Sequence, residues 1–216
     1  MKNSQPIVRP LFVETEDNQD RLMAQFVQPG LIGVVGDPDS GKSNLLYYVI
    51  QQLQALYDFK LYTYGLRLNI ADEQKIYSLG QLEVISNSII IIDEFTSMFD
   101  VDNRKEKKQI ENTLRLLFHN NNVVLFCGLS ENFKKFIASK LDAVIYKRCM
   151  LDDMINGSRV KKLAVAYRGY ELGASVLNID NDKALLFDGA NYSMVEVPYI
   201  EAGDTKKKNP DILVAR

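Results

Sequence analysis

Short apolar runs alternate with polar segments along the first 150 residues of the chain. Unbroken runs rich in β-branched side chains are typical of strands buried on both faces of a parallel sheet. Three segments have this character: 31–35, 89–92 and 123–127. Segments 44–56 and 110–118 instead repeat apolar residues at helical spacing. The pattern predicts an α/β fold with a mostly parallel central sheet flanked by helices.

The pattern changes after residue 142, where apolar stretches are separated by turn signals such as Asn156-Gly157 and Asp188-Gly189. We expect strands at 143–150, 161–170, 183–187 and 192–199, part of which form an antiparallel extension of the sheet edge near the C-terminus. A further strand at 59–64 and a short helix at 79–85 are also predicted. Residues 1–30 are interpreted as an N-terminal extension, with a strand at 7–13 and a polar, acidic stretch at 14–21.

The segment between strand 31–35 and helix 44–56 carries the pattern Gly-x-x-x-x-Gly-Lys-Ser, which is typical of a phosphate-binding loop. Gly36 and Gly41 leave backbone N–H groups free to converge on phosphate. Lys42 can reach the β- and γ-phosphates, and Ser43 can bind Mg²⁺ through its hydroxyl. The alternative, a glycine turn without a ligand, is disfavoured by the flanking strand and helix. The predicted nucleotide-binding residues are Gly36, Asp37, Pro38, Asp39, Ser40, Gly41, Lys42, Ser43 and Asn44.

The apolar run 89–92 ends in Asp93 and Glu94, which is the Walker B pattern. The carboxyl ends of parallel strands meet at one edge of the sheet, so Asp93 is expected beside the phosphates, where it would hold Mg²⁺ together with Ser43. Glu94 is then placed to orient the attacking water, and we predict it to be catalytic together with Lys42. The structural alternative is a core strand that ends in a solvated acidic turn. The sequence also leaves room for another strand between the two motifs.

Polar residues follow the run 123–127, at the position where related nucleotide hydrolases sense the γ-phosphate. Ser130 and Asn132 are the candidates for this role. Either residue is equally suited to cap the helix that is expected to begin near Asn132. Both interpretations stay open at this stage.

Charged residues gather in 100–112, including Arg104, Lys105, Lys107 and Lys108. A solvated helix face explains such a cluster most simply. The functional alternative is contact with nucleic acid or with a neighbouring subunit.

Composition limits the remaining possibilities. The chain has 216 residues, a length that fits one main domain. Its formal net charge is −2, which gives no indication of an overall affinity for nucleic acid. Its two cysteines and single histidine lack zinc-ligand spacing, and we expect both cysteines to be reduced core residues. With neither a signal-peptide pattern nor a membrane-length apolar run, the protein is expected to be soluble and cytoplasmic. Residues 139–142 superficially match a guanine-binding motif but precede a strand instead of ending one, which favours ATP.

Together, the loop GDPDSGKS, the strand IIIIDEF, the strand VVLFCGLSEN and the β-rich C-terminus without a helical lid resemble the FtsK/HerA superfamily. Within it, the chain is similar to genome-packaging ATPases of membrane-containing double jelly-roll viruses. The family usually carries glutamine where this chain has Ser130. The resemblance covers 31–200, interpreted as a P-loop ATPase domain; 201–216 is interpreted as a flexible basic tail.

This resemblance implies a Mg²⁺-dependent ATPase that forms an oligomeric, usually hexameric ring and translocates double-stranded DNA. Capsid or membrane vertex proteins would be its docking partners, and its location would be the host cytoplasm or the virion. An arginine acting in trans is also implied; the sequence leaves its identity open among Arg67, Arg104, Arg115 and Arg148.

Two other functions remain compatible with the motifs. One is an assembly ATPase resembling phage morphogenesis proteins of the zonula occludens toxin type, which usually carry a membrane span. The other is a nucleotide-gated switch of the helicase-loader kind, with little turnover. Glu94 separates the switch from the motor, because a switch needs no carboxylate to position water.

Overall fold

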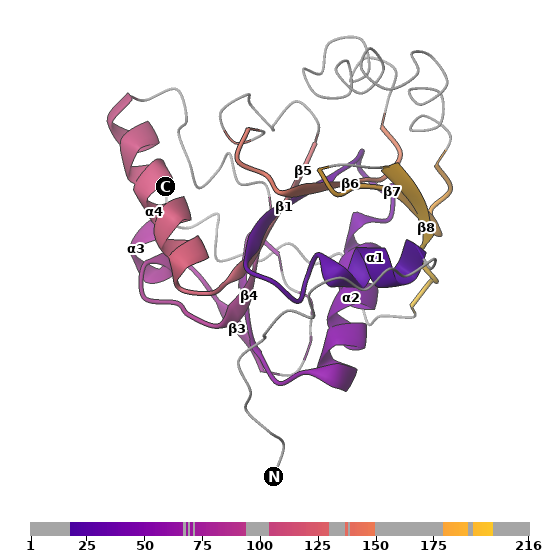
Figure 1. Ribbon diagram of the computed structural model, residues 1–216, viewed down its shortest axis with the longest axis horizontal. Helices are drawn as coiled ribbons and strands as arrows, with labels where there is room; N and C mark the ends of the chain where they lie inside the picture. Colours follow the sequence, from indigo (N-terminus) through magenta and orange to yellow (C-terminus); the bar gives the residue numbers. More distant parts are fainter. Residues whose placement is uncertain are drawn as a thin grey trace.

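The computed structural model describes residues 18–66, 68, 70, 72–93, 104–129, 137, 139–149, 179–189 and 192–200. Within these residues, one sheet has the strand order β3-β2-β4-β5-β1-β6-β7-β8 (Figure 1). Its strands are β1 (Gly30–Val35), β2 (Lys60–Tyr64), β3 (Glu73–Lys75), β4 (Ser88–Asp93), β5 (Val123–Gly128), β6 (Ala143–Tyr146), β7 (Lys183–Phe187) and β8 (Tyr192–Glu196). The helices are α1 (Asn18–Ala24), α2 (Lys42–Leu56), α3 (Leu79–Leu82) and α4 (Arg104–His119).

The sheet is parallel from β3 to β6 and antiparallel from β6 to β8. The predicted fold class and the antiparallel extension at one edge are therefore confirmed. In the sheet, β5 lies between β1 and β4, and Cys127 of β5 is in register with Val34 of β1 on one side and Asp93 of β4 on the other. The strand that carries the phosphate loop and the strand that ends in Asp93 are thus separated by one strand.

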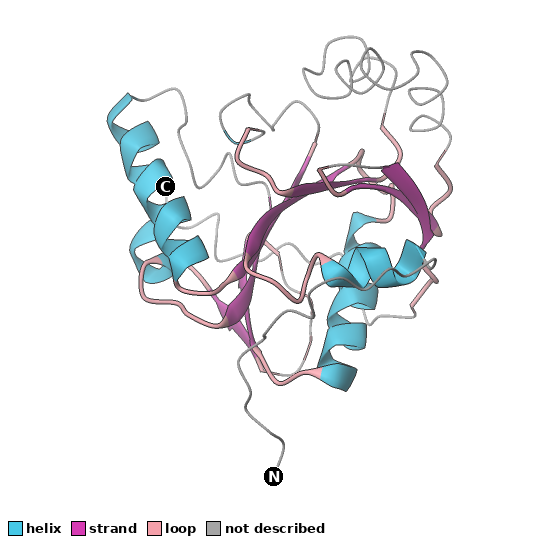
Figure 2. Ribbon diagram, viewed as in Figure 1, coloured by secondary structure: helices cyan, strands magenta, loops and turns pink. Residues whose placement is uncertain are grey.

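Two apolar layers hold the sheet between its helices (Figure 2). Ile89 and Ile91 of β4 face α1 and α2, whereas Ile90 and Ile92 face α3 and α4. All four isoleucines are at most 3 % exposed. This alternation shows why an unbroken apolar run was needed here: each neighbouring residue points to an opposite face, and both faces are covered.

Helix α1 is a feature that the sequence did not predict. Its surroundings explain it, because Leu22 is buried among the residues of α2 and the sheet. Asn18 Nδ2 donates to Met194 O at 3.0 Å and Gln19 Nε2 donates to Glu196 O, so that α1 is attached along β8. Arg21 pairs with Asp188. Part of the predicted N-terminal extension is therefore packed against the outer strand of the sheet.

The other predicted elements lie close to their expected bounds, although the helix predicted over 79–85 ends at Leu82. Strand β3 was not predicted from the sequence. The predicted strands at 7–13 and 161–170 and the tail 201–216 lie outside the described residues. Cys127 and Cys149 are buried and form no disulfide, as predicted. In the part of the chain that the structure describes, no helix has the length and apolar character needed to cross a membrane.

Asn122, just before β5, joins three segments at the edge of the sheet opposite the motifs. Its Oδ1 accepts from Ser88 N–H at 3.1 Å, and its Nδ2 donates to Ile85 O at 2.8 Å and Leu117 O at 3.0 Å. The side chain is fully buried. It therefore adds three buried hydrogen bonds to backbone groups around the start of β4.

Asn122→Ala should lower the free energy of unfolding by about 2 to 3 kcal/mol, because it removes three buried hydrogen bonds, including the one that the Ser88 N–H donates. Asn120→Ala is the matched control. Its half-buried amide donates to Glu83 O and Ile85 O at 3.2 and 3.3 Å, so that its loss should cost about 1 kcal/mol or less. Urea denaturation of both variants tests this difference, and equal losses would contradict the role of Asn122.

Candidate nucleotide-binding site

The two sequence motifs meet at one edge of the sheet. The segment from Gly36 to Ser43 follows β1 directly and leads into α2, and Asp93 is the last residue of β4. Because β1, β4 and β5 are parallel, their carboxyl ends share this edge. The structure thus brings the predicted phosphate loop and the predicted Mg²⁺ ligand to the same place.

The two glycines of the loop have different physical reasons for being glycine. Gly41 adopts φ +88°, in the left-handed region that side chains rarely occupy. At Gly36 the constraint is space, because an added Cβ would lie 2.7 Å from Ser40 Oγ and 2.7 Å from Lys147 Cβ. Neighbouring strands hold the loop from both sides: Gly36 N–H donates to Gly128 O at 3.3 Å, and Asp37 N–H donates to Arg148 O at 2.9 Å.

The loop delivers unpaired donors to the start of α2. Gly41 is the N-cap of this helix, and no side chain caps its first N–H groups. The Ser40 hydroxyl is buried and has no hydrogen-bond partner among the described residues. Free N–H groups at a helix N-terminus attract anions. Bare backbone and a buried hydroxyl without a partner therefore fit a phosphate group.

Lys42 reaches back across the loop. Its Nζ donates to Gly36 O at 2.7 Å and to Asp37 O at 2.6 Å. Burial lowers the pKa of Lys42, while the negative charges of Asp93 and, more weakly, Asp37 oppose this shift. The side chain is thus electrostatically linked to the strand end that carries Asp93, as expected for a lysine placed between phosphate and metal.

Gly65, after β2, is a part of the site that sequence reasoning missed. It has φ +74°, and an added Cβ would lie 2.7 Å from Asp93 O. The chain after β2 therefore packs directly on the backbone of Asp93 and helps to fix the end of β4. A signal for it was present in the sequence, because a lone glycine directly after a strand often marks a close backbone approach.

Ser43 and Asp93 provide a hydroxyl and a carboxylate, oxygen ligands of the type that Mg²⁺ prefers. The described residues contain no group of three or more His, Cys, Asp or Glu side chains that could hold a metal on their own. Mg²⁺ usually keeps several waters and is bound through one or two protein ligands together with substrate phosphates. The two residues fit such a site.

Asn44, also predicted to bind nucleotide, uses its side chain elsewhere. Its Nδ2 donates to Pro198 O at 3.1 Å, and its Oδ1 accepts from Ile200 N–H at 2.8 Å. These bonds attach the chain that follows β8 to the first turn of α2. The proposed contact of Asn44 with nucleotide stays a prediction, and the observed role of its amide is structural.

The other predicted residues are only partly covered by the structure. Glu94, Ser130, Asn132 and Arg67 lie outside the described residues, as does the side chain of Arg104 at the start of α4. Arg148 is exposed next to the loop, and Arg115 is exposed on α4. The identity of an arginine acting in trans stays open.

A hollow of about 470 Å³ lies between α4 and the turn before β6. It is lined by Leu31, Arg115 and Asp142 among others. Leu31 is near the start of β1, so the hollow is at the opposite edge of the sheet from the phosphate loop. It has no bare backbone comparable to the loop, and we do not assign the nucleotide to it.

No family model matches the chain, and no curated protein matches its sequence. Solved structures do match its fold. The genome packaging NTPase B204 from Sulfolobus turreted icosahedral virus 2, in complex with sulfate, aligns with a TM-score of 0.61 and 15 % identity over 80 % of this chain and 98 % of B204.

Two larger proteins share the fold over part of their length. The pCW3 conjugation coupling protein TcpA aligns with a TM-score of 0.53 and 14 % identity over 80 % of this chain and 61 % of TcpA. EssC from Geobacillus thermodenitrificans aligns with a TM-score of 0.50 and 12 % identity over 82 % of this chain and 38 % of that one. The chain thus has the fold of P-loop ATPases. At the level of fold, its predicted resemblance to FtsK/HerA-type packaging ATPases is confirmed.

Gly65→Ala should lower the free energy of unfolding by about 1 to 3 kcal/mol, because it combines a positive φ with a clash against Asp93 O. Gly80→Ala is the control. An added Cβ there meets nothing within 4 Å, and alanine in α3 should stabilise the protein by about 0.5 to 1 kcal/mol. Denaturant unfolding measures both changes. A Gly65 variant as stable as the Gly80 variant would contradict the close approach to Asp93.

Proposed function

We propose that the protein is a Mg²⁺-dependent ATPase that translocates double-stranded DNA as a homo-oligomeric ring, of the kind that packages viral genomes. The observation that carries the nucleotide part is the phosphate loop itself. Its glycines fit the close approach of backbone to phosphate, and Lys42 lies across the loop. The N-terminus of α2 directly follows Gly41. This arrangement favours a polyphosphate over an uncharged ligand.

In this proposal, Lys42 binds the β- and γ-phosphates and Ser43 and Asp93 hold Mg²⁺. Bound Mg²⁺ would neutralise charge that develops on the transferred phosphoryl group. Glu94, the residue after Asp93, would orient the attacking water and accept its proton. Its place in the chain supports this role, because it directly follows Asp93, the last residue of β4, and β4 ends at the edge of the sheet where the loop lies.

The DNA part of the proposal is supported by fold similarity and by surface charge. B204 is a genome packaging NTPase and TcpA is a conjugation coupling protein. Lys107 and Lys108 are exposed on the first turns of α4. This helix follows β4, so its beginning lies towards the edge of the sheet that carries the nucleotide site. A DNA phosphate contact there would be close to the site of hydrolysis, and a ring would supply the second subunit that an arginine acting in trans requires.

Lys42→Ala and Glu94→Gln should separate binding from turnover. Lys42→Ala should weaken ATP binding roughly tenfold or more, since a hydrogen bond to a charged group contributes about 1.5 to 3 kcal/mol. Glu94→Gln should keep ATP affinity and lose about 10²- to 10⁴-fold in turnover, as expected for a missing general base. Calorimetric titration and phosphate release measure the two quantities. Normal hydrolysis by Glu94→Gln would refute its catalytic role.

Double-stranded DNA should raise the steady-state ATPase rate, and the effect should fade as salt increases, because contacts to DNA phosphates release counterions. The assay is phosphate release with and without DNA, with the oligomeric state measured alongside. Between 50 and 200 mM salt, DNA affinity should fall by about one order of magnitude for every two or three contacts to DNA phosphates. Lys107→Ala/Lys108→Ala should reduce the stimulation. ATP binding without turnover under all conditions would favour a nucleotide-gated switch instead of a motor.

A further inference from the structure

Lys147 lies directly against the phosphate loop. It follows β6, and its backbone N–H donates to Val35 O at 2.7 Å, next to the end of β1. Its side chain is fully buried. A Cβ added to Gly36 would lie 2.7 Å from Lys147 Cβ, and a Cβ added to Gly41 would lie 3.2 Å from its Cε and 3.4 Å from its Nζ. Both glycines of the motif therefore contact this one lysine.

Main-chain oxygens hold the ammonium group of Lys147. Its Nζ donates to Asn181 O at 2.8 Å and to Lys183 O at 2.5 Å. Among the described residues, no carboxylate forms an ion pair with it. Since an ammonium group has three N–H donors, these two bonds leave one donor beside Gly41. A buried cation with carbonyl partners and no anion is an unfavourable arrangement on its own.

Positive charge thus accumulates at the motif from three sources: Lys42, Lys147 and the N-terminus of α2. A polyphosphate would provide the missing negative charge for all three at once. No carboxylate bonded to Lys147 would have to be displaced first.

We propose that Lys147 is a positioning residue of the nucleotide site, which fixes the phosphate loop against the start of β7 and adds a second lysine charge to the binding of a nucleoside polyphosphate. This inference rests on the nucleotide site proposed above and names a residue that the motifs do not contain. Lys147 acts through the loop and through its charge, and it takes no part in the reaction itself.

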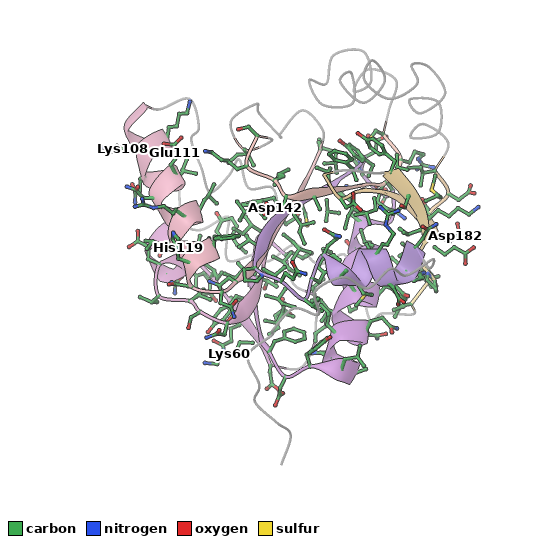
Figure 3. All side chains as sticks on the ribbon, in the orientation of Figure 1. Lys60, Lys108, Glu111, His119, Asp142 and Asp182 are labelled. Carbon is green, nitrogen blue, oxygen red and sulfur yellow. The ribbon has the colours of Figure 1, made fainter. Side chains whose placement is uncertain are left out.

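The same contacts link the nucleotide to the β7–β8 hairpin. Lys147 binds the carbonyls of Asn181 and Lys183 at the start of the hairpin, and Asn44 binds Pro198 and Ile200 after its end. Both ends of the hairpin are therefore attached to the loop or to the first turn of α2. A phosphate that attracts Lys147 would therefore also act on the start of β7, beside Asp182. Figure 3 labels Asp182 at that end of the sheet.

The charge of Lys147 gives the proposal a pH signature. Burial lowers the pKa of Lys147 to about 8, and the Asp182 carboxylate opposes this shift. A bound polyphosphate favours the protonated lysine, so ATP affinity should fall as the pH rises through about 8. Besides Lys147, the ionisable groups on the loop, at or after the end of β6 and at the start of β7 are Asp37, Asp39, Lys42, Tyr146, Arg148, Cys149, Asp180, Asp182 and Lys183.

The test is titration of the full chain with Mg·ATP and with inorganic tripolyphosphate between about pH 6.5 and 9.5, spanning the Lys147 transition. If binding raises the pKa of Lys147 by about one unit, wild-type affinity should fall roughly tenfold across this range. Lys147→Met should bind roughly tenfold more weakly at pH 7, and its affinity should lack this fall. Lys147→Arg should retain affinity at pH 7 and also lose the fall, since arginine does not deprotonate.

Two exposed aspartates provide a test that leaves Lys147 in place. Asp182→Asn removes the carboxylate that raises the pKa of Lys147, so the midpoint of the pH dependence should move to lower pH. Asp180→Asn is the matched control, because Asp180 pairs with Lys183 at 3.5 Å and should leave the midpoint unchanged. This arm decides the question even if Lys147→Met does not fold.

The outcomes distinguish the inference from the function on which it rests. Wild-type protein that binds neither ATP nor tripolyphosphate would refute both. Wild-type protein that binds ATP, with Lys147→Met and Asp182→Asn matching its affinity and pH dependence, would refute the role of Lys147 and leave the nucleotide site intact. A shifted midpoint in Asp182→Asn but not in Asp180→Asn supports the proposal.

Discussion

The structure depends on one constraint at the phosphate loop. Positively charged lysine side chains and glycine backbone must lie close together there, without other side chains between them. Lys42 and Lys147 approach the same loop from two sides, and glycine at positions 36 and 41 lets them do so. Hydrogen bonds hold the loop in this place. Gly36 N–H donates to Gly128 O at the end of β5, and Asp37 N–H donates to Arg148 O, two residues after the end of β6.

The sheet supplies this support because its central strands are parallel and covered on both faces. Parallel strands bring the ends of β1, β4, β5 and β6 to one edge, and the two apolar layers fix their register. A slip of one residue in β4 would exchange the residues that face α2 with those that face α4. It would also move Asp93 away from its place in register with Cys127. The position of the acidic residue is thus a consequence of the packing of four isoleucines.

The sequence predicted the parts of this arrangement that are local. The isoleucine run and the glycine-lysine-serine loop each have a pattern that one physical requirement explains, and both are where they were expected. Helix α1 and strand β3 were missed because their stability comes from distant partners: α1 is attached to β8, and β3 is a short polar strand paired with β2. Lys147 was missed for the same reason, because its role appears only when the order of strands in the sheet is known. For Gly65, the glycine after a predicted strand was a signal for a close approach, but only the strand order shows that the backbone it approaches is that of Asp93.

The attachment of α1 to β8 determines how copies of this chain can associate. An outer strand with free backbone groups is a template for pairing with another strand. Here Met194 O and Glu196 O on β8 already accept hydrogen bonds from Asn18 and Gln19. Another copy would have to displace α1 before its own strand could pair at this edge. The β8 edge of the sheet is thereby protected against strand pairing with another copy of the chain.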